Sequence, residues 1–283
     1  SCRAGAMTGG TAFVLAGGGS LGAVQVGMLM ALVEAGLQPD LVVGSSVGAL
    51  NAAHFADAPD LKGLTRLAEI WCGLRRADIF PASLSGLIGI LRGSDSIVDP
   101  APLRRLLENH LSFTLIEEAR LPLHVMATDQ QGLSVCLSAG PAVEAILASA
   151  AVPGIFPPVT IDGRQLMDGA IAANTPLRMA VELGATRIVV LPTGYACALQ
   201  GANHSAIARM LHAVTLLIAW QLMHEIETVP DDVTVHLAPA LCPLTVSPYD
   251  FTASRQLIDR ARSGTQAWVA AGGLTRRAAA REL

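Results

Sequence analysis

Residues 40–48, which read DLVVGSSVG, decide the fold of this chain. The apolar run at 41–43 is short, rich in β-branched residues and followed by glycine, which is typical of a strand buried on both faces of a sheet. A helical pattern at 49–56 comes next, so the segment GSSVG lies where a strand turns into a helix. The sequence therefore predicts an α/β sheet with a G-x-S-x-G turn at the carboxyl end of one central strand.

This turn contains the candidate nucleophile. Gly44 and Gly48 flank it, and their lack of side chains relieves crowding where the chain reverses. Ser46 occupies the central position, so its hydroxyl is expected to project from the top of the sheet. Ser45 occupies the variable position and is expected to end the strand. The amide of Val47, directly after the nucleophile, is a candidate donor to an oxyanion.

A glycine cluster, GGGSLG at residues 17–22, follows a second apolar run at 12–16 and precedes a helical pattern at 23–35. Such a cluster exposes amide N–H groups at a helix N-terminus, where they stabilise an anion. The anion could be an oxyanion or a dinucleotide pyrophosphate, and a turn that only permits close packing is a third reading. Dinucleotide binding expects an acidic residue at the end of the next strand, but Asp40 stands at its beginning. The oxyanion is therefore favoured.

Two Asp-Gly pairs lie six residues apart. Asp162-Gly163 separates two short alternating segments and predicts a hairpin turn without chemistry. Asp168-Gly169 instead follows an apolar pair and precedes the apolar run that begins at Ala170. A carboxylate in such a setting is poorly solvated, and desolvation strengthens it as a base toward a neighbouring hydroxyl.

Four blocks of the sequence together resemble the patatin-like phospholipase family. They are the glycine cluster with the helix start at 17–29, GSSVG at 44–48, ASAAVPGIFPP at 148–158, and Asp168-Gly169-Ala170, and they occur in the family's order and spacing. The resemblance covers 11–176 and departs from the commonest pattern at Leu21, where many members have Arg or Lys, and at Ala170, where many have Gly.

The resemblance implies an acyl hydrolase with a Ser-Asp dyad. Ser46 would be the nucleophile and Asp168 the base, and no histidine would be required. The implied oxyanion hole and remaining motif glycines are Gly17, Gly18, Gly19, Gly22, Gly44, Gly48 and Gly169, with Val47. The expected activity is hydrolysis of lipid esters, with phospholipid or lysophospholipid as the likeliest substrate class. Acyl transfer by the same dyad, and a nucleotide- or lipid-binding module without catalysis, are the alternatives.

We expect a single three-layer α/β domain over residues 7–283, with a mainly parallel sheet flanked by helices. Strands are predicted at 12–16, 41–45, 123–128, 187–191 and 233–237, with hairpin turns near Gly132 and Gly163. Residues 1–6, ahead of Met7, are expected to be an expression remnant, and 81–102 a surface excursion. Asn174 is expected to cap a helix that begins near Pro176.

Residues 210–223 are apolar nearly all round, which predicts a helix buried in the core; a dimer contact or a lipid-facing lid remains open. The four histidines after Asp168 could complete a catalytic triad, but none has a distinctive context, so we expect ordinary surface or packing roles for them. They are His204, His212, His224 and His236.

Composition limits the other partners. The net charge is −4 and no basic run is long enough to follow a phosphate backbone, so we expect no nucleic acid partner. The five cysteines form no CxxC pair and His224-Glu225 is not part of an HExxH motif, so we expect neither a metal nor another cofactor. We predict no signal peptide or membrane span and a cytoplasmic location, leaving open a peripheral membrane contact and a homo-oligomer.

Overall fold

Eight strands form one sheet in the computed structural model, which describes residues 9–79, 98–194, 206–241 and 250–278. Their order across the sheet is β5-β6-β3-β2-β1-β7-β8, and β4 pairs with β3. The strands are β1 (Thr11–Leu15), β2 (Leu41–Ser45), β3 (Leu123–Asp129), β4 (Ser134–Leu137), β5 (Val159–Ile161), β6 (Arg164–Asp168), β7 (Arg187–Leu191) and β8 (Thr234–Leu237).

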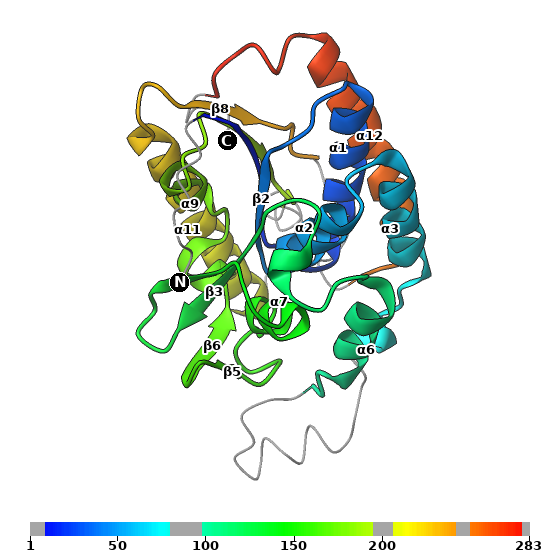
Figure 1. Cartoon of the computed structure of the whole chain (residues 1–283), viewed down its shortest axis with the longest axis vertical. Helices are drawn as coiled ribbons and strands as arrows, with labels where there is room; N and C mark the ends of the chain where they lie inside the picture. The colour runs from blue at the N-terminus through cyan, green and yellow to red at the C-terminus, as the bar shows by residue number, and fades with distance from the viewer. Residues whose placement is uncertain (1–8, 80–97, 195–205, 242–249, 279–283) are drawn as a thin grey trace.

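Helices cover both faces of this sheet (Figure 1). One side carries α1 (Ala23–Glu34), α2 (Val47–Asp57), α3 (Leu61–Gly73) and α12 (Ser254–Ala270), and the other carries α9 (Leu177–Glu182) and α11 (Ala206–Thr228). Shorter elements are η1 (Gly19–Gly22), α4 (Arg76–Ile79), α6 (Ala101–His110), η2 (Ile116–Glu118), α7 (Ala142–Ser149) and α8 (Ala170–Ala173).

The alternation along β1 shows why the strands are apolar throughout. Phe13 and Leu15 belong to the core on the α1 side, whereas Ala12 and Val14 belong to the core on the α9 side. Because successive side chains of a strand point to opposite faces, a sheet covered on both sides needs apolar residues at every position. The expected three-layer α/β domain is confirmed.

The strands β3, β2, β1, β7 and β8 run parallel to their neighbours in this order. The two predicted hairpins, β3–β4 and β5–β6, form the antiparallel part of the sheet. Asp162 and Gly163 turn the β5–β6 hairpin with positive φ values of 49° and 74°. That conformation matches the right-handed twist of paired strands, which is why Asp-Gly marks such turns.

The register of β3 brings two distant segments together. Its residue Met126 pairs with Ser45 of β2 and with β4, and the next residue, Ala127, pairs with Asp168 of β6 and with β4. Because β4 occupies one edge of β3 at both positions, β2 and β6 share the other edge. The strand β6 therefore continues the ladder where β2 ends, beside Ser46.

Two local expectations are wrong. Leu216, Leu217 and Trp220 of α11 are 56%, 67% and 65% exposed, because one face of this helix packs on α9 and the sheet and its opposite apolar face stays outside. Asn174 does not cap α9; it follows α8, and Pro176 itself precedes α9 without a side-chain cap. The predicted remnant at 1–6 and residues 81–97 of the expected surface excursion lie outside the described ranges.

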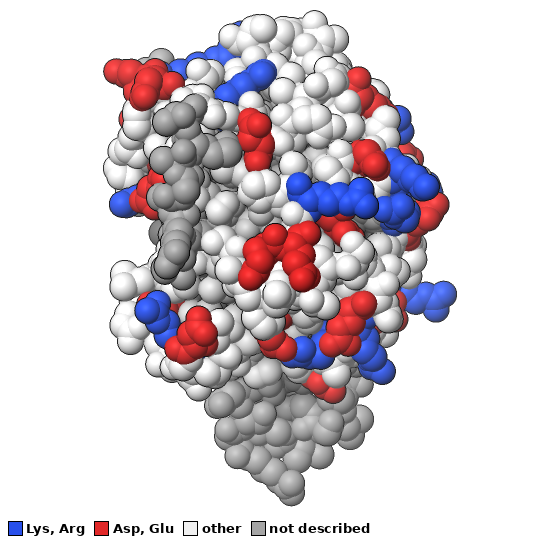
Figure 2. Space-filling view, viewed as in Figure 1, with Lys and Arg blue, Asp and Glu red and all other residues white. Residues whose placement is uncertain are grey.

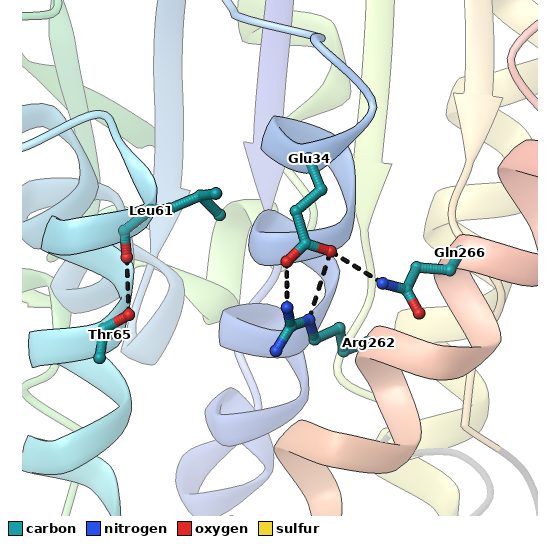
Figure 3. A network of polar contacts seen from close by, with 5 residues as sticks. All are labelled: Glu34, Leu61, Thr65, Arg262 and Gln266. Carbon is teal, nitrogen blue, oxygen red and sulfur yellow. Dashed lines mark hydrogen bonds and ion pairs between the residues drawn. The ribbon is translucent and has the colours of Figure 1, made fainter.

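The C-terminal helix α12 returns to pack along α1. Arg262 and Gln266 of α12 both bond the carboxylate of Glu34 at the end of α1 (Figure 3). Charged residues of both signs are interspersed on the face drawn in Figure 2. None of the helices within the described ranges is long and apolar enough to cross a membrane.

Candidate active site

Ser46 lies in a strained turn between β2 and α2. Its φ of 53° and ψ of −125° are unusual for a residue with a side chain. The neighbouring glycines allow the turn: a Cβ at Gly44 would lie 2.5 Å from the Gly48 carbonyl oxygen, and one at Gly48 would overlap the Leu15 carbonyl. The GSSVG segment therefore forms the sharp strand-to-helix turn that its sequence predicts.

The hydroxyl of Ser46 donates a hydrogen bond of 2.7 Å to Oδ2 of Asp168. Asp168 is only 3% exposed, and this burial raises the pKa of its carboxyl to about 6, although hydrogen bonds from Ser46 and from the Ala170 amide oppose the shift. The Ala170 N–H holds the other oxygen, Oδ1, at 2.7 Å. The carboxylate thus keeps one oxygen for the serine and is a stronger base than an exposed aspartate.

Backbone contacts fix the segment that carries Asp168. Thr128 donates its hydroxyl to the Asp168 carbonyl at 2.8 Å, and the Asp168 N–H donates to the Ala151 carbonyl at 2.9 Å. A Cβ at Gly169 would overlap the carbonyl of Met126 in β3. The position of Asp168 is therefore fixed by backbone hydrogen bonds and by close packing of Gly169 on β3, as well as by the hydrogen bonds of its carboxylate.

Ser149, at the end of α7, contacts both halves of the site. Its Oγ accepts the Ser46 N–H at 2.8 Å, and its carbonyl accepts the Gly169 N–H at 3.1 Å. Ser149 lies within the family-like block at 148–158, whose sequence gives this residue no role of its own. The only signal was its membership of that block, since the contact joins residues 103 positions apart.

The glycine cluster lies against the same turn, and its backbone amides differ in whether they have a hydrogen-bond acceptor. The Gly17 N–H donates to the Asn174 carbonyl at 3.0 Å, and the Gly17 carbonyl accepts the Thr193 hydroxyl at 2.7 Å, so the Gly17 amide is engaged within the fold. Among the described residues, the amides of Gly18 and Gly19 donate to no carbonyl. Gly18 and Gly19, with Val47 at the start of α2, therefore remain the candidate donors to an oxyanion.

An apolar pocket opens beside Ser46. It has a volume of about 720 Å³ including its mouth, and Gly19, Ser46 and Val47 lie on its wall. The rest of the lining comes mainly from α2, α3 and α6 and from segments near α7 and α12. Its larger apolar residues are Leu50, Ile70, Trp71, Leu103, Phe156 and Phe251. An apolar chain would therefore be bound with one end at the serine hydroxyl.

His54 lines this pocket, and its Nδ1 lies 2.9 Å from the Leu50 carbonyl. The described histidines that follow Asp168 make other contacts. The His224 ring stacks on Trp220 with centroids 5.6 Å apart, and His236 Nδ1 lies 2.9 Å from the Arg276 carbonyl. His204 and the side chain of His212 lie outside the described residues. The partner of the Ser46 hydroxyl is a carboxylate, with no imidazole between them.

The fold and this site define an α/β protein whose mostly parallel sheet has a sharp G-x-S-x-G turn, centred on Ser46, at the carboxyl end of one strand. Residues 13–181 match the family model for patatin-like phospholipase. The chain therefore belongs to the patatin-like phospholipase family.

Two individual relatives have less than 30% sequence identity to this chain. The chain is 28% identical over 186 residues to patatin-like phospholipase domain-containing protein 7 of Rattus norvegicus, covering 65% of this chain and 13% of the relative. It is 27% identical over 184 residues to neuropathy target esterase sws of Drosophila melanogaster, covering 64% of this chain and 13% of the relative. The chain thus spans about one eighth of these proteins. A solved structure, VipD from Legionella pneumophila, aligns with a TM-score of 0.49 and 15% identity over 93% of this chain and 67% of its own.

Proposed function

We propose that this protein is a serine acyl hydrolase that cleaves carboxylic esters of lipids, with Ser46 as nucleophile and Asp168 as general base. The observation that carries the proposal is the 2.7 Å hydrogen bond between the Ser46 hydroxyl and the buried Asp168 carboxylate. Burial raises the pKa of that carboxyl to about 6, so it is ionised at neutral pH yet retains affinity for the serine proton.

In the first half-reaction, Ser46 Oγ attacks the ester carbonyl carbon while its proton moves to Asp168 Oδ2. The carbonyl oxygen becomes an oxyanion, for which the N–H groups of Gly18, Gly19 and Val47 are the donors. The intermediate collapses as the bond to the alcohol oxygen breaks, and that oxygen takes the proton from Asp168. An acyl-enzyme and a free alcohol result.

In the second half-reaction, water attacks the acyl-enzyme and gives its proton to Asp168. Collapse of the second tetrahedral intermediate breaks the bond to Ser46 Oγ, which recovers the proton from Asp168. The carboxylic acid leaves, and the resting pair is restored. No histidine takes part, so one carboxylate serves both steps as base and then acid.

The apolar pocket supports a lipid ester as the substrate class. Apart from Ser46, Asn51 and His54, the residues that line it are apolar or glycine, which favours an acyl chain over a polar acyl group. The family and the relatives named phospholipase and esterase point to a phospholipid or lysophospholipid. Mass spectrometry of products from a mixed lipid extract, with and without an added alcohol, would identify the ester and separate hydrolysis from acyl transfer.

Labelling with a fluorophosphonate tests the nucleophile, because only an activated serine reacts quickly. We expect stoichiometric labelling at Ser46 and loss of ester hydrolysis in Ser46→Ala by about 10⁴-fold or more. The matched control is Ser45→Ala, which removes the same group one position earlier, where the hydroxyl is buried in β2. Labelling that persists in Ser46→Ala, or a loss below about tenfold, would contradict the assignment.

A further inference from the structure

A buried polar cluster lies behind the glycine cluster, and its centre is the side chain of Gln25 on α1. The Gln25 Nε2 group donates to the carbonyls of Ala16 at 2.8 Å and Leu191 at 3.0 Å, where β1 and β7 end. Gln25 Oε1 accepts from Asn51 Nδ2 at 2.8 Å. Gln25 is fully buried; two of these bonds use both N–H donors of its amide, and the third engages its Oε1 acceptor, without help from solvent.

Asn51 on α2 continues the cluster. Its Nδ2 group also donates to the Gly22 carbonyl at 2.9 Å, and its Oδ1 accepts the Trp71 Nε1–H at 2.9 Å. Asn51 and Trp71 are buried as well. The indole can only donate, so it fixes which end of the Asn51 amide is oxygen and directs both N–H groups toward Gly22 and Gln25.

These contacts hold both ends of the loop that carries the candidate oxyanion donors. Ala16 is the residue before that loop and Gly22 is its last residue, and their carbonyls bond the two linked amides. Asn51 lies five residues after Ser46, on the helix that begins with Val47. One rigid cluster therefore connects the Gly18–Gly19 backbone to the helix that presents the nucleophile.

We propose that Gln25 and Asn51 are positioning residues that set the distance between the Gly18 and Gly19 amides and Ser46. The inference rests on the proposed hydrolase function, because it gives those amides an oxyanion to bind. Packing around Gly22 is consistent with a fixed loop, since a Cβ there would overlap Val47 and lie 2.9 Å from the Trp71 ring. Fixed donors are what stabilise a transition state, and a displacement of about 1 Å can cost about 10²-fold in rate.

The variant Gln25→Met tests the proposal because methionine has nearly the same length and volume and lacks all three hydrogen bonds. We expect kcat on a short-chain p-nitrophenyl ester to fall by about 10²-fold, with KM changed by less than about threefold. The acidic limb of the pH profile should stay in place, because the Ser46–Asp168 contact involves neither residue of the cluster. The assays are run well below the melting temperature of the variant, so that the rates refer to folded protein.

The matched control is Gln266→Met, which makes the same chemical change on α12, where Gln266 contacts Glu34 at the other end of α1. Gln266 is exposed and donates to Glu34 at 2.8 Å, away from the site (Figure 3). We expect its kcat to stay within about twofold of the parent. Equal losses in the two variants would indicate general loosening of α1 and would overturn the proposal, as would a folded Gln25→Met protein with parental kcat.

Trp71→Phe provides a second, milder test if Gln25→Met does not fold. It keeps an aromatic ring and removes the one donor that orients the Asn51 amide, so we expect kcat to fall by about 3- to 10-fold. A folded Trp71→Phe protein with unchanged kcat overturns the proposal. If the parent neither hydrolyses esters nor labels at Ser46, the proposed function fails; if it does both and Gln25→Met matches it, only the positioning role fails.

Discussion

Asp162-Gly163 and Asp168-Gly169 are the same dipeptide six residues apart, and their surroundings differ completely. Asp162 is exposed at the tip of the β5–β6 hairpin, and a Cβ at Gly163 would meet open space. Asp168 is buried at the end of β6, bonded to Ser46, and a Cβ at Gly169 would overlap backbone of β3. The dipeptide is a turn signal in the first case and places a buried carboxylate against Ser46 in the second.

The difference teaches that burial and partners, rather than the motif, give an aspartate its chemistry. The first pair needs only a positive φ, which Asp and Gly tolerate. In the second, the surrounding strands exclude water from the carboxylate while supplying one hydroxyl and one amide as donors. Variants of the two Asp-Gly pairs should therefore differ in activity, pH dependence and stability, and equal effects would contradict this difference.

The largest expected effect is on turnover. Asp168→Asn should abolish ester hydrolysis as fully as Ser46→Ala, by about 10⁴-fold, because an amide cannot accept the serine proton. Asp162→Asn should leave kcat and KM unchanged within about twofold, since its side chain lies at an exposed hairpin tip. Steady-state kinetics on one ester would measure both, and an Asp168→Asn enzyme that retained a tenth of the activity would refute the dyad.

Replacing Gly169 or Gly163 with alanine should have different effects on activity and stability. In Gly169→Ala the new methyl group overlaps the Met126 carbonyl, so the backbone beside Asp168 must move, and we expect about 10²-fold lower kcat and a clearly lower melting temperature. Gly163→Ala meets no atom and should cost about 1 kcal/mol for the positive φ alone, with kcat unchanged. Equal effects on activity would remove the contrast between the two turns.

The dependence of kcat/KM on pH should follow the ionisation of the Asp168 carboxyl. Its carboxyl must be ionised to accept a proton, and burial raises its pKa to about 6, so kcat/KM should fall about tenfold per pH unit below that value and level off above it. Asp162→Asn should give a superimposable profile. An acidic limb that lay near 4 would show that Asp168 is not the titrating base.

The smallest expected effect is on stability. Because folding raises the pKa of Asp168, its contribution to stability is fully present below its unfolded value near 4 and is lost as the pH rises through about 6. Asp168→Asn should therefore melt a few degrees higher than the parent at pH 8, and this gain should disappear toward pH 4. Asp162→Asn should show no such pH-dependent gain, and thermal melts at the two pH values would detect the difference.

Much of the fold could be predicted from the sequence, and the structure brings the two candidate residues Ser46 and Asp168 into contact. The strand boundaries at 41–45 and 187–191 are those of the structure, because each of these buried parallel strands contains a continuous apolar run that marks its position. The wrong expectation for α11 has a related cause: Leu216, Leu217 and Trp220 are apolar like core residues, but hydrophobicity alone does not show which side of a helix finds a partner.

The sequence by itself determined most of the strands and the G-x-S-x-G turn, because glycine spacing and the period of apolar residues act locally along the chain. Only the tertiary structure decided that the Gly17 amide is engaged within the fold, that Ser149 bonds Ser46, and that Gln25 and Asn51 link the glycine loop to α2. Those contacts join segments far apart in the chain. They depend on the register in which β6 takes over the edge of β3 from β2, and no local pattern specifies that register.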